Sequence, residues 1–94
     1  MGYAPREFAR TLSGGFVAAG SGFDLSECGA GCWVVSVPEH ALSVTVRISA
    51  AAPRRFGAFA LPVLDVQLTF SPDNEKNRRI FLDRFWRYFH KGGG

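Results

Sequence analysis

The sequence has little of what usually identifies a small protein. It contains only two cysteines, two histidines and one methionine in 94 residues. Two cysteines are too few for the disulfide framework that holds small secreted domains together. No apolar run approaches the roughly 20 residues that a membrane-spanning helix needs. The short apolar stretch at 16–19 lies between glycines and follows a charged, helical-looking start, so we expect no secretory signal. We therefore expect a soluble, cytoplasmic protein.

What the sequence does contain is typical of a folded protein. Hydrophobic residues make up 47% of the chain and charged residues 20%, with nine phenylalanines. Disordered chains are poor in aromatic residues, so we expect one folded domain over 1–94. The net charge of +3 is unevenly placed, because 1–50 carries three basic against four acidic residues and 51–94 carries eight against four. A basic half is a weak indication of an anionic partner.

Helix signals stand at both ends of the chain. Pro5 at a first turn and the apolar spacing that follows predict a short helix over about 5–13, stopped by Gly14 and Gly15. Ser71-Pro72-Asp73 is typical of a helix start, with a capping hydroxyl and a proline at the first helical position. This second helix should run to about Lys91 and bury one broad aromatic face with Phe85 near its middle.

Three stretches between these helices alternate apolar and polar residues, at 33–37, 42–48 and 64–70. Such alternation predicts antiparallel strands with one buried face and one wet face. The residues at 17–31 are rich in glycine and irregular, with at most a short strand near 22–25. Because the wet faces need no cover, both helices should lie on the same side. The fold class we expect is α+β, a two-layer α-β-β-β-α domain with an antiparallel sheet and both helices on one face.

Catalytic and metal-binding motifs are weak. Cys28 and Cys32 have a wider spacing than the thioredoxin-like pair, and a zinc site usually shows two ligand pairs. We interpret them as small side chains in a turn, with a metal or redox site as the alternative. His40 and His90 have no distinctive acid or base partner. We therefore expect no metal or other cofactor and lean against an enzyme.

The last predicted helix is basic. Five cations stand against Asp83 alone between 78 and 91, namely Arg78, Arg79, Arg84, Arg87 and Lys91. Such a face can contact the phosphates of RNA or DNA. It can equally be an ordinary solvated helix face whose arginine stems cover apolar surface.

The predicted order of helix, three strands and helix is similar to that of the double-stranded-RNA-binding domain. The turn at 38–41, Pro-Glu-His-Ala before an alternating strand, also resembles that family's Gly-Pro-x-His turn. The resemblance implies that His40 reaches a minor groove and that Lys76, Arg78 and Arg79 at the last helix meet phosphates across a major groove. The sequence departs from the family at Val37, which replaces the turn glycine, and at 74–77, which lacks the lysine-rich helix start.

A long connector at 50–60 mixes cationic and aromatic residues, namely Arg54, Arg55, Phe56 and Phe59. Arginine and aromatic residues are enriched among the anchors of protein interfaces. We therefore expect this linker to contact another protein or a second copy of the chain, as in a homodimer. The alternative is that both phenylalanines pack onto the core. The function predicted is a small non-enzymatic binding module, with nucleic-acid binding by the basic helix as the second possibility.

Overall fold

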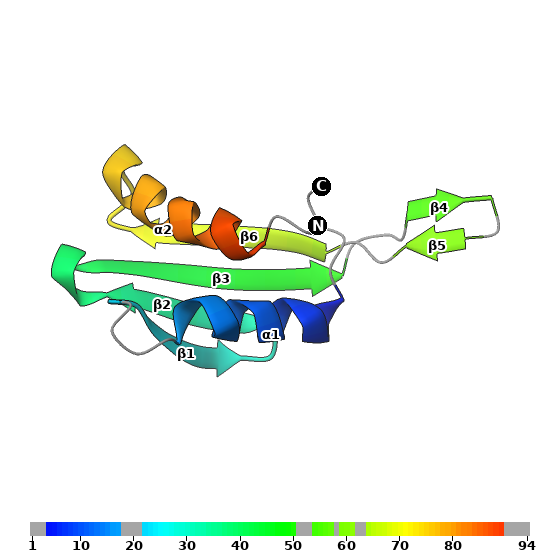
Figure 1. The fold of residues 1–94 in the computed structure, drawn as a ribbon, viewed down its shortest axis with the longest axis horizontal. Coiled ribbons are helices and arrows are strands. Elements are labelled where there is room, and N and C mark those ends of the chain that lie inside the picture. Colours follow the sequence, from blue (N-terminus) through cyan, green and yellow to red (C-terminus); the bar gives the residue numbers. More distant parts are fainter. Residues whose placement is uncertain (1–3, 18–21, 51–53, 58, 62–63, 90–94) are drawn as a thin grey trace.

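The computed structural model describes residues 4–17, 22–50, 54–57, 59–61 and 64–89. The elements follow one another as α1 (Pro5–Phe16), β1 (Asp24–Gly29), β2 (Cys32–Val37), η1 (Pro38–His40), β3 (Leu42–Ala50), β4 (Arg54–Phe56), β5 (Phe59–Leu61), β6 (Leu64–Ser71) and α2 (Glu75–Tyr88) (Figure 1). Neither α1 nor α2, the helices of the described residues, is long and apolar enough to cross a bilayer.

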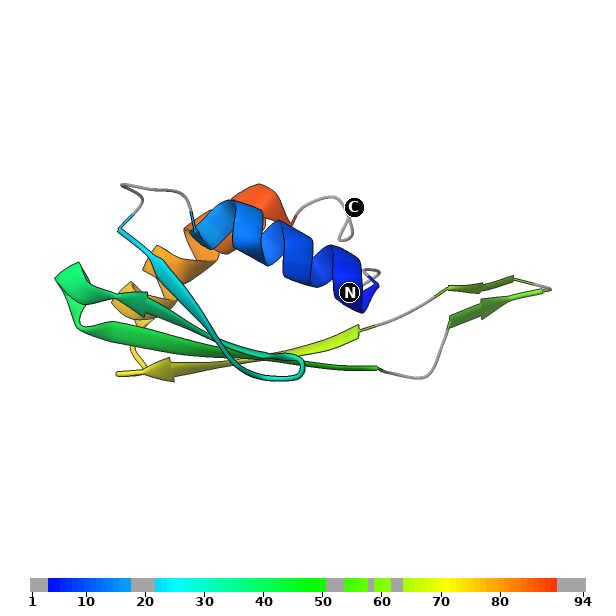
Figure 2. The ribbon, with the colours of Figure 1, turned by 90° about the horizontal axis from the view of Figure 1, so that it is seen from below.

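The domain has two layers. Four antiparallel strands form one sheet in the order β1-β2-β3-β6, and both helices lie on the same face of it (Figure 2). The expected α+β class and the placement of both helices on one face are therefore confirmed. No helix of the described residues lies on the opposite face of the sheet, and we call it the bare face.

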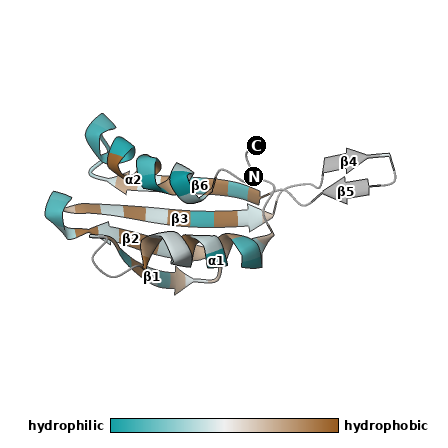
Figure 3. Cartoon of the chain, viewed as in Figure 1, coloured by the Kyte–Doolittle hydropathy of each residue, from teal (hydrophilic) through white to brown (hydrophobic). Residues whose placement is uncertain are grey.

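The alternation in the sequence places residues on these two faces. Val35, Val44 and Val46 are fully buried under the helices, and the bands of hydropathy along β3 show the alternation (Figure 3). Exposed Ser43 and Arg47 stand between them on the bare face. Directly paired residues share a face. The register from β2 across β3 to β6 therefore keeps apolar residues together on the helix-covered face, while on the bare face polar pairs predominate and Val34 lies opposite Thr45.

The expected number of strands is wrong, because the sheet has four strands and not three. The additional strand, β1, pairs with β2 over a stretch that the sequence marks as irregular. Leu25 is its only aliphatic residue and is half-buried, while the other five residues of the strand are exposed. An edge strand that buries so little has no alternating pattern to reveal it.

Both helix boundaries of the sequence prediction need correction. Helix α1 continues through Gly14 and Gly15 to Phe16. Gly15 is buried against Tyr88 of α2, where an added Cβ would lie 3.0 Å from the tyrosine ring. A glycine at this position serves close helix–helix approach, not termination.

Helix α2 begins at Glu75 rather than after Ser71, which is the last residue of β6. Asn74 is the N-cap, and its Oδ1 accepts a hydrogen bond from the backbone N–H of Asn77 at 2.8 Å. The buried Asn77 amide in turn donates to the carbonyl of Pro72 at 2.9 Å. The helix ends at Tyr88, three residues before the expected end.

The core between the layers is built from aromatic rings of both helices. The Phe85 ring stacks on Phe89 with centroids 4.3 Å apart, and the Phe81 ring stacks on Phe16 of α1 at 5.1 Å. Phe8 of α1 joins them to the sheet through Trp33, with centroids 5.8 Å apart. The expectation that Phe85 lies at the centre of the buried face is confirmed, since it is 2% exposed.

Replacement of this ring tests the core. Phe85→Ala should lower the free energy of unfolding by roughly 3–5 kcal/mol, because the stack on Phe89 is lost and a cavity remains. Arg87→Ala is the control on the same helix, since Arg87 is exposed. Chemical denaturation measures both. A loss below about 1 kcal/mol for Phe85→Ala would contradict the assigned face.

Candidate functional site

The connector that the sequence marks as a linker is a β-hairpin. Ala50 is the last residue of β3, and strands β4 and β5 pair with each other as a separate two-stranded sheet. The hairpin lies beyond the end of the main sheet, along the long axis of a molecule whose Cα atoms span 49 Å (Figures 1 and 2). We call β4 and β5 the arm.

The arm is offset from the strand pair that leads into it. The β3–β6 ladder ends at the pair Ala50–Leu64, and the arm begins at the pair Arg54–Leu61. Three residues separate the two pairs on one side and two on the other, so the ladders differ by one residue. The arm is therefore a distinct hairpin and not a simple continuation of β3 and β6.

The four predicted contact residues all fall on the arm. Arg54, Arg55 and Phe56 form β4, and Phe59 opens β5. The register pairs Phe56 with Phe59, next to the turn at Gly57. Gly57 has φ +59°, the left-handed conformation that favours glycine in a tight turn. The structure thus brings the predicted contact residues together at one end of the molecule.

The basic residues at the start of α2 are engaged in ion pairs. Arg78 contacts Asp73 with its Nε 2.6 Å from the carboxylate, and Arg79 contacts Glu75 at 3.1 Å. Hydrogen bonds from the guanidinium lower the pKa of Asp73 and raise that of Arg78. Both pairs are exposed, so they contribute little to stability. With Lys76 counted, three cations and two acids leave a net charge of +1 over 73–79.

Arg84 has a structural position between the helices. Its Nε donates a hydrogen bond to the carbonyl of Gly15, in the last turn of α1. Its guanidinium lies over the rings of Phe23 and Tyr88, 5.2 and 5.5 Å from their centroids. Arg84 therefore joins the two helices, whereas Arg87 is exposed in the last turn of α2. Lys91 lies outside the described residues.

RNA binding as the resemblance implies it stays a prediction. His40 is exposed in the short helix η1, and the sheet has a fourth strand beside the three of the expected order. Within the described part of the chain, no group of three or more His, Cys, Asp or Glu side chains is arranged to hold a metal ion. His90 lies outside it.

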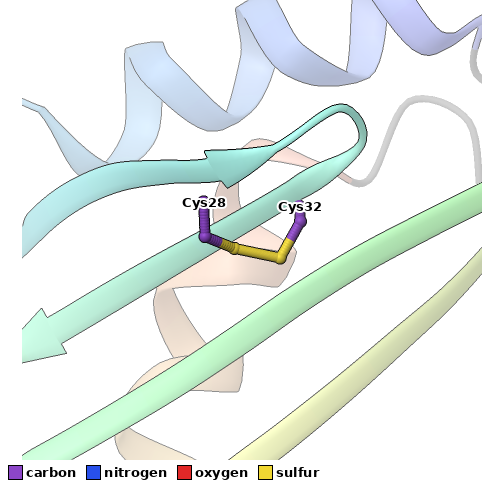
Figure 4. Close-up of a disulfide and its surroundings, with 2 residues drawn as sticks. All are labelled: Cys28 and Cys32. Atoms are coloured by element: carbon purple, nitrogen blue, oxygen red, sulfur yellow. A yellow bond between two sulfur atoms is a disulfide. The ribbon is translucent and has the colours of Figure 1, made fainter.

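The two cysteines lie at the turn between β1 and β2, as expected, and form a disulfide that the sequence interpretation did not include (Figure 4). Cys32 pairs across the strands with Arg47, which places it on the bare face, and Cys28 is exposed. The turn between them is also held by the backbone, since Ile48 N–H donates to the carbonyl of Gly31 at 2.9 Å. The expected absence of a disulfide framework was part of the argument for the cytoplasm, and that location stays a prediction.

Arg84 gives a test of the contact between the helices. Arg84→Gln should lower the free energy of unfolding by roughly 1.5–3 kcal/mol, because a charged hydrogen bond and several ring contacts are lost. Arg87→Gln removes the same charge from an exposed site and should change it by less than about 0.5 kcal/mol. Denaturant titration compares them. Equal effects of the two variants would show that the charge alone matters.

The disulfide gives a second test. The double variant Cys28→Ser with Cys32→Ser should keep the fold, and its free energy of unfolding should fall by about 2 kcal/mol. The loss is small because the disulfide closes a short loop and so restricts the unfolded chain only a little. The reduced parent should match the variant in denaturant titration. Purified parent should contain no stoichiometric zinc by elemental analysis. Unfolding of the double variant would instead show that the disulfide is required for the fold.

Comparison of the chain with protein families, with curated proteins and with solved structures finds no match. The arrangement of its own residues is therefore the basis on which a function can be proposed.

Proposed function

We propose that this chain is a non-enzymatic binding module that contacts another protein, and that the arm carries the contact. The observation that supports this most directly is the place of the arm, a two-stranded hairpin beyond the end of the sheet (Figure 2). An isolated two-stranded hairpin is only marginally stable in water. Such an element gains stability when it docks against a partner.

The residue types of the arm agree with this role. Its six paired residues are Arg-Arg-Phe on β4 and Phe-Ala-Leu on β5. Arginine and phenylalanine are enriched in the cores of protein interfaces, where lysine and acidic residues are depleted. The arm contains no acidic residue and no lysine. Its composition is thus closer to an interface than to an ordinary polar loop.

Nucleic-acid binding by α2 has less support. Of the basic residues proposed for it, Arg78 and Arg79 are paired with acids and Arg84 is bonded to α1. Phosphate binding by these side chains would first have to break those contacts. Electrostatic binding draws its strength from cations that are free to replace counterions.

The disulfide makes a site-specific test possible. Among the described residues no cysteine is free, so an introduced cysteine is a unique attachment point for a photo-crosslinker. We expect the Ala60→Cys protein, labelled in the arm, to crosslink to a discrete partner in a cell extract. The Ser13→Cys protein is the control, because Ser13 is exposed on α1, far along the chain from the arm.

Competition then identifies the residues responsible. Excess unlabelled parent should abolish the crosslink, while Phe56→Ser with Phe59→Ser should not compete. Circular dichroism should show that the double variant is folded, and denaturation should give a free energy of unfolding within about 0.5 kcal/mol of that of the parent. Equal competition by parent and variant would contradict the proposal. Unfolding of the variant would place both phenylalanines in the core and also contradict it.

A further inference from the structure

The two edges of the main sheet differ in their protection against pairing. Edge strand β1 carries Asp24 and Glu27 and has a register shift between Glu27 and Gly29. Charges and bulges are the usual means by which an edge is blocked. Edge strand β6 runs for eight residues without a proline, a lysine or a shift of register, and its one charged residue is Asp65. Among the described residues, β6 is thus the open edge.

The side chains of β6 that face the helices are incompletely covered. Val66, Leu68 and Phe70 are only half-buried, although their neighbours Val44 and Val46 on β3 are fully buried. The apolar side of the sheet therefore continues to its β6 edge and is left partly open there. Burial of this row is favourable in proportion to the area that a partner would remove from water.

Helix α2 adds apolar surface beside the same edge. It lies along β6, whereas α1 lies on the β1–β2 side (Figure 1). Arg84 marks the side of α2 that faces α1, because it bonds to Gly15. Leu82 lies two residues before Arg84 and Trp86 two residues after it. Each therefore projects about 160° away from Arg84 around the helix axis. They thus border the β6 edge, where Leu82 is half-buried and Trp86 is 50% exposed.

The charges beside this edge are balanced. Arg78 lies one turn before Leu82 on the same side of α2. Arg79 is the next residue after Arg78. Each is neutralised within the chain, Arg78 by Asp73 and Arg79 by Glu75. Two such helices can therefore approach each other without repulsion between like charges.

We infer that β6 pairs with β6 of a second copy of this chain, antiparallel about a two-fold axis, to make a continuous sheet through a dimer. The inference concerns a different surface from the arm and is independent of the function proposed for it. A two-fold dimer is the commonest symmetric assembly of a soluble protein.

The sequence of β6 fits its own copy. In the register centred on Leu68, Leu68 faces itself and Val66 faces Phe70, so apolar residues meet on the helix-covered side. On the bare side Gln67 faces Thr69, and Asp65 faces Ser71. No charge then lies opposite a like charge, which cross-strand pairing would penalise. This self-complementarity favours a second copy over an unrelated strand as the occupant.

Sedimentation equilibrium over a range of concentrations tests this dimer. We expect the parent to dimerise, and Gln67→Lys with Thr69→Lys to weaken the dimer by at least about tenfold, since lysines then face each other across the axis. Both residues are exposed on the bare face, so the fold should be kept. Ser26→Lys, on exposed β1, is the control and should dimerise as the parent does.

A second variant tests the helix border. Trp86→Ser should also weaken the dimer. Val17→Ser, which removes an apolar side chain that is 60% exposed at the C-cap of α1, should not. Circular dichroism confirms that each variant is folded. A parent that stays monomeric at millimolar concentration overturns the inference. So does a dimer that survives both changes at β6 and Trp86, or one that is lost only with Phe56→Ser and Phe59→Ser in the arm.

Discussion

Both helices are held to the sheet by one continuous row of aromatic rings, and the other features of the fold depend on it. Phe16 stacks on Phe81 and Phe85 stacks on Phe89, while Phe8 bridges the second pair to Trp33 of β2. Rings of this size fill the space between two layers with few side chains, which suits a chain of 94 residues. They also determine how closely α1 and α2 approach each other. The close approach suits a glycine at position 15, and it brings the Arg84 guanidinium within hydrogen-bond distance of the Gly15 carbonyl.

A core confined to one side of the sheet determines which surfaces are open. The helices cover the apolar face, and the bare face is mostly serine, threonine and other polar residues, so it needs no cover. A depression on the bare face, lined in part by Arg47, Asp65 and Gln67, is open to solvent rather than enclosed. What is incomplete is the backbone pairing, at the edge of β6 and in the two-stranded arm. Both are parts of the chain between Leu42 and Ser71, and both are suited to contact with another polypeptide.

The sequence was most informative where one physical rule governs a whole element. The strict alternation along 42–48 and 64–70 predicts β3 and β6, and the shared polar face predicts helices on one side only; the structure agrees with both. The aromatic spacing of the last helix likewise predicts Phe85 in the core, where it lies. Two other elements were not predictable in this way. Strand β1 has one partly buried aliphatic residue and the arm pairs only with itself, so neither produces a periodic signal.

Local features failed for a different reason, because they depend on partners far along the chain. Gly14 and Gly15 have the composition of a helix stop, but Gly15 lies inside the helix, where the Tyr88 ring leaves little room for a Cβ. Ser71 has the composition of a helix cap, but it is still paired with Ser43 in the sheet, so Asn74 caps the helix instead. The count of arginines in α2 misleads in the same way. The sequence shows that a residue is charged but does not show which carboxylate or carbonyl it will bind in the fold. Once Arg78, Arg79 and Arg84 are seen to be engaged, net charge ceases to be the argument for a partner. The argument for a partner then depends on the unpaired edge of β6, the two-stranded arm and the half-exposed Trp86. These features favour contact with a protein over contact with nucleic acid.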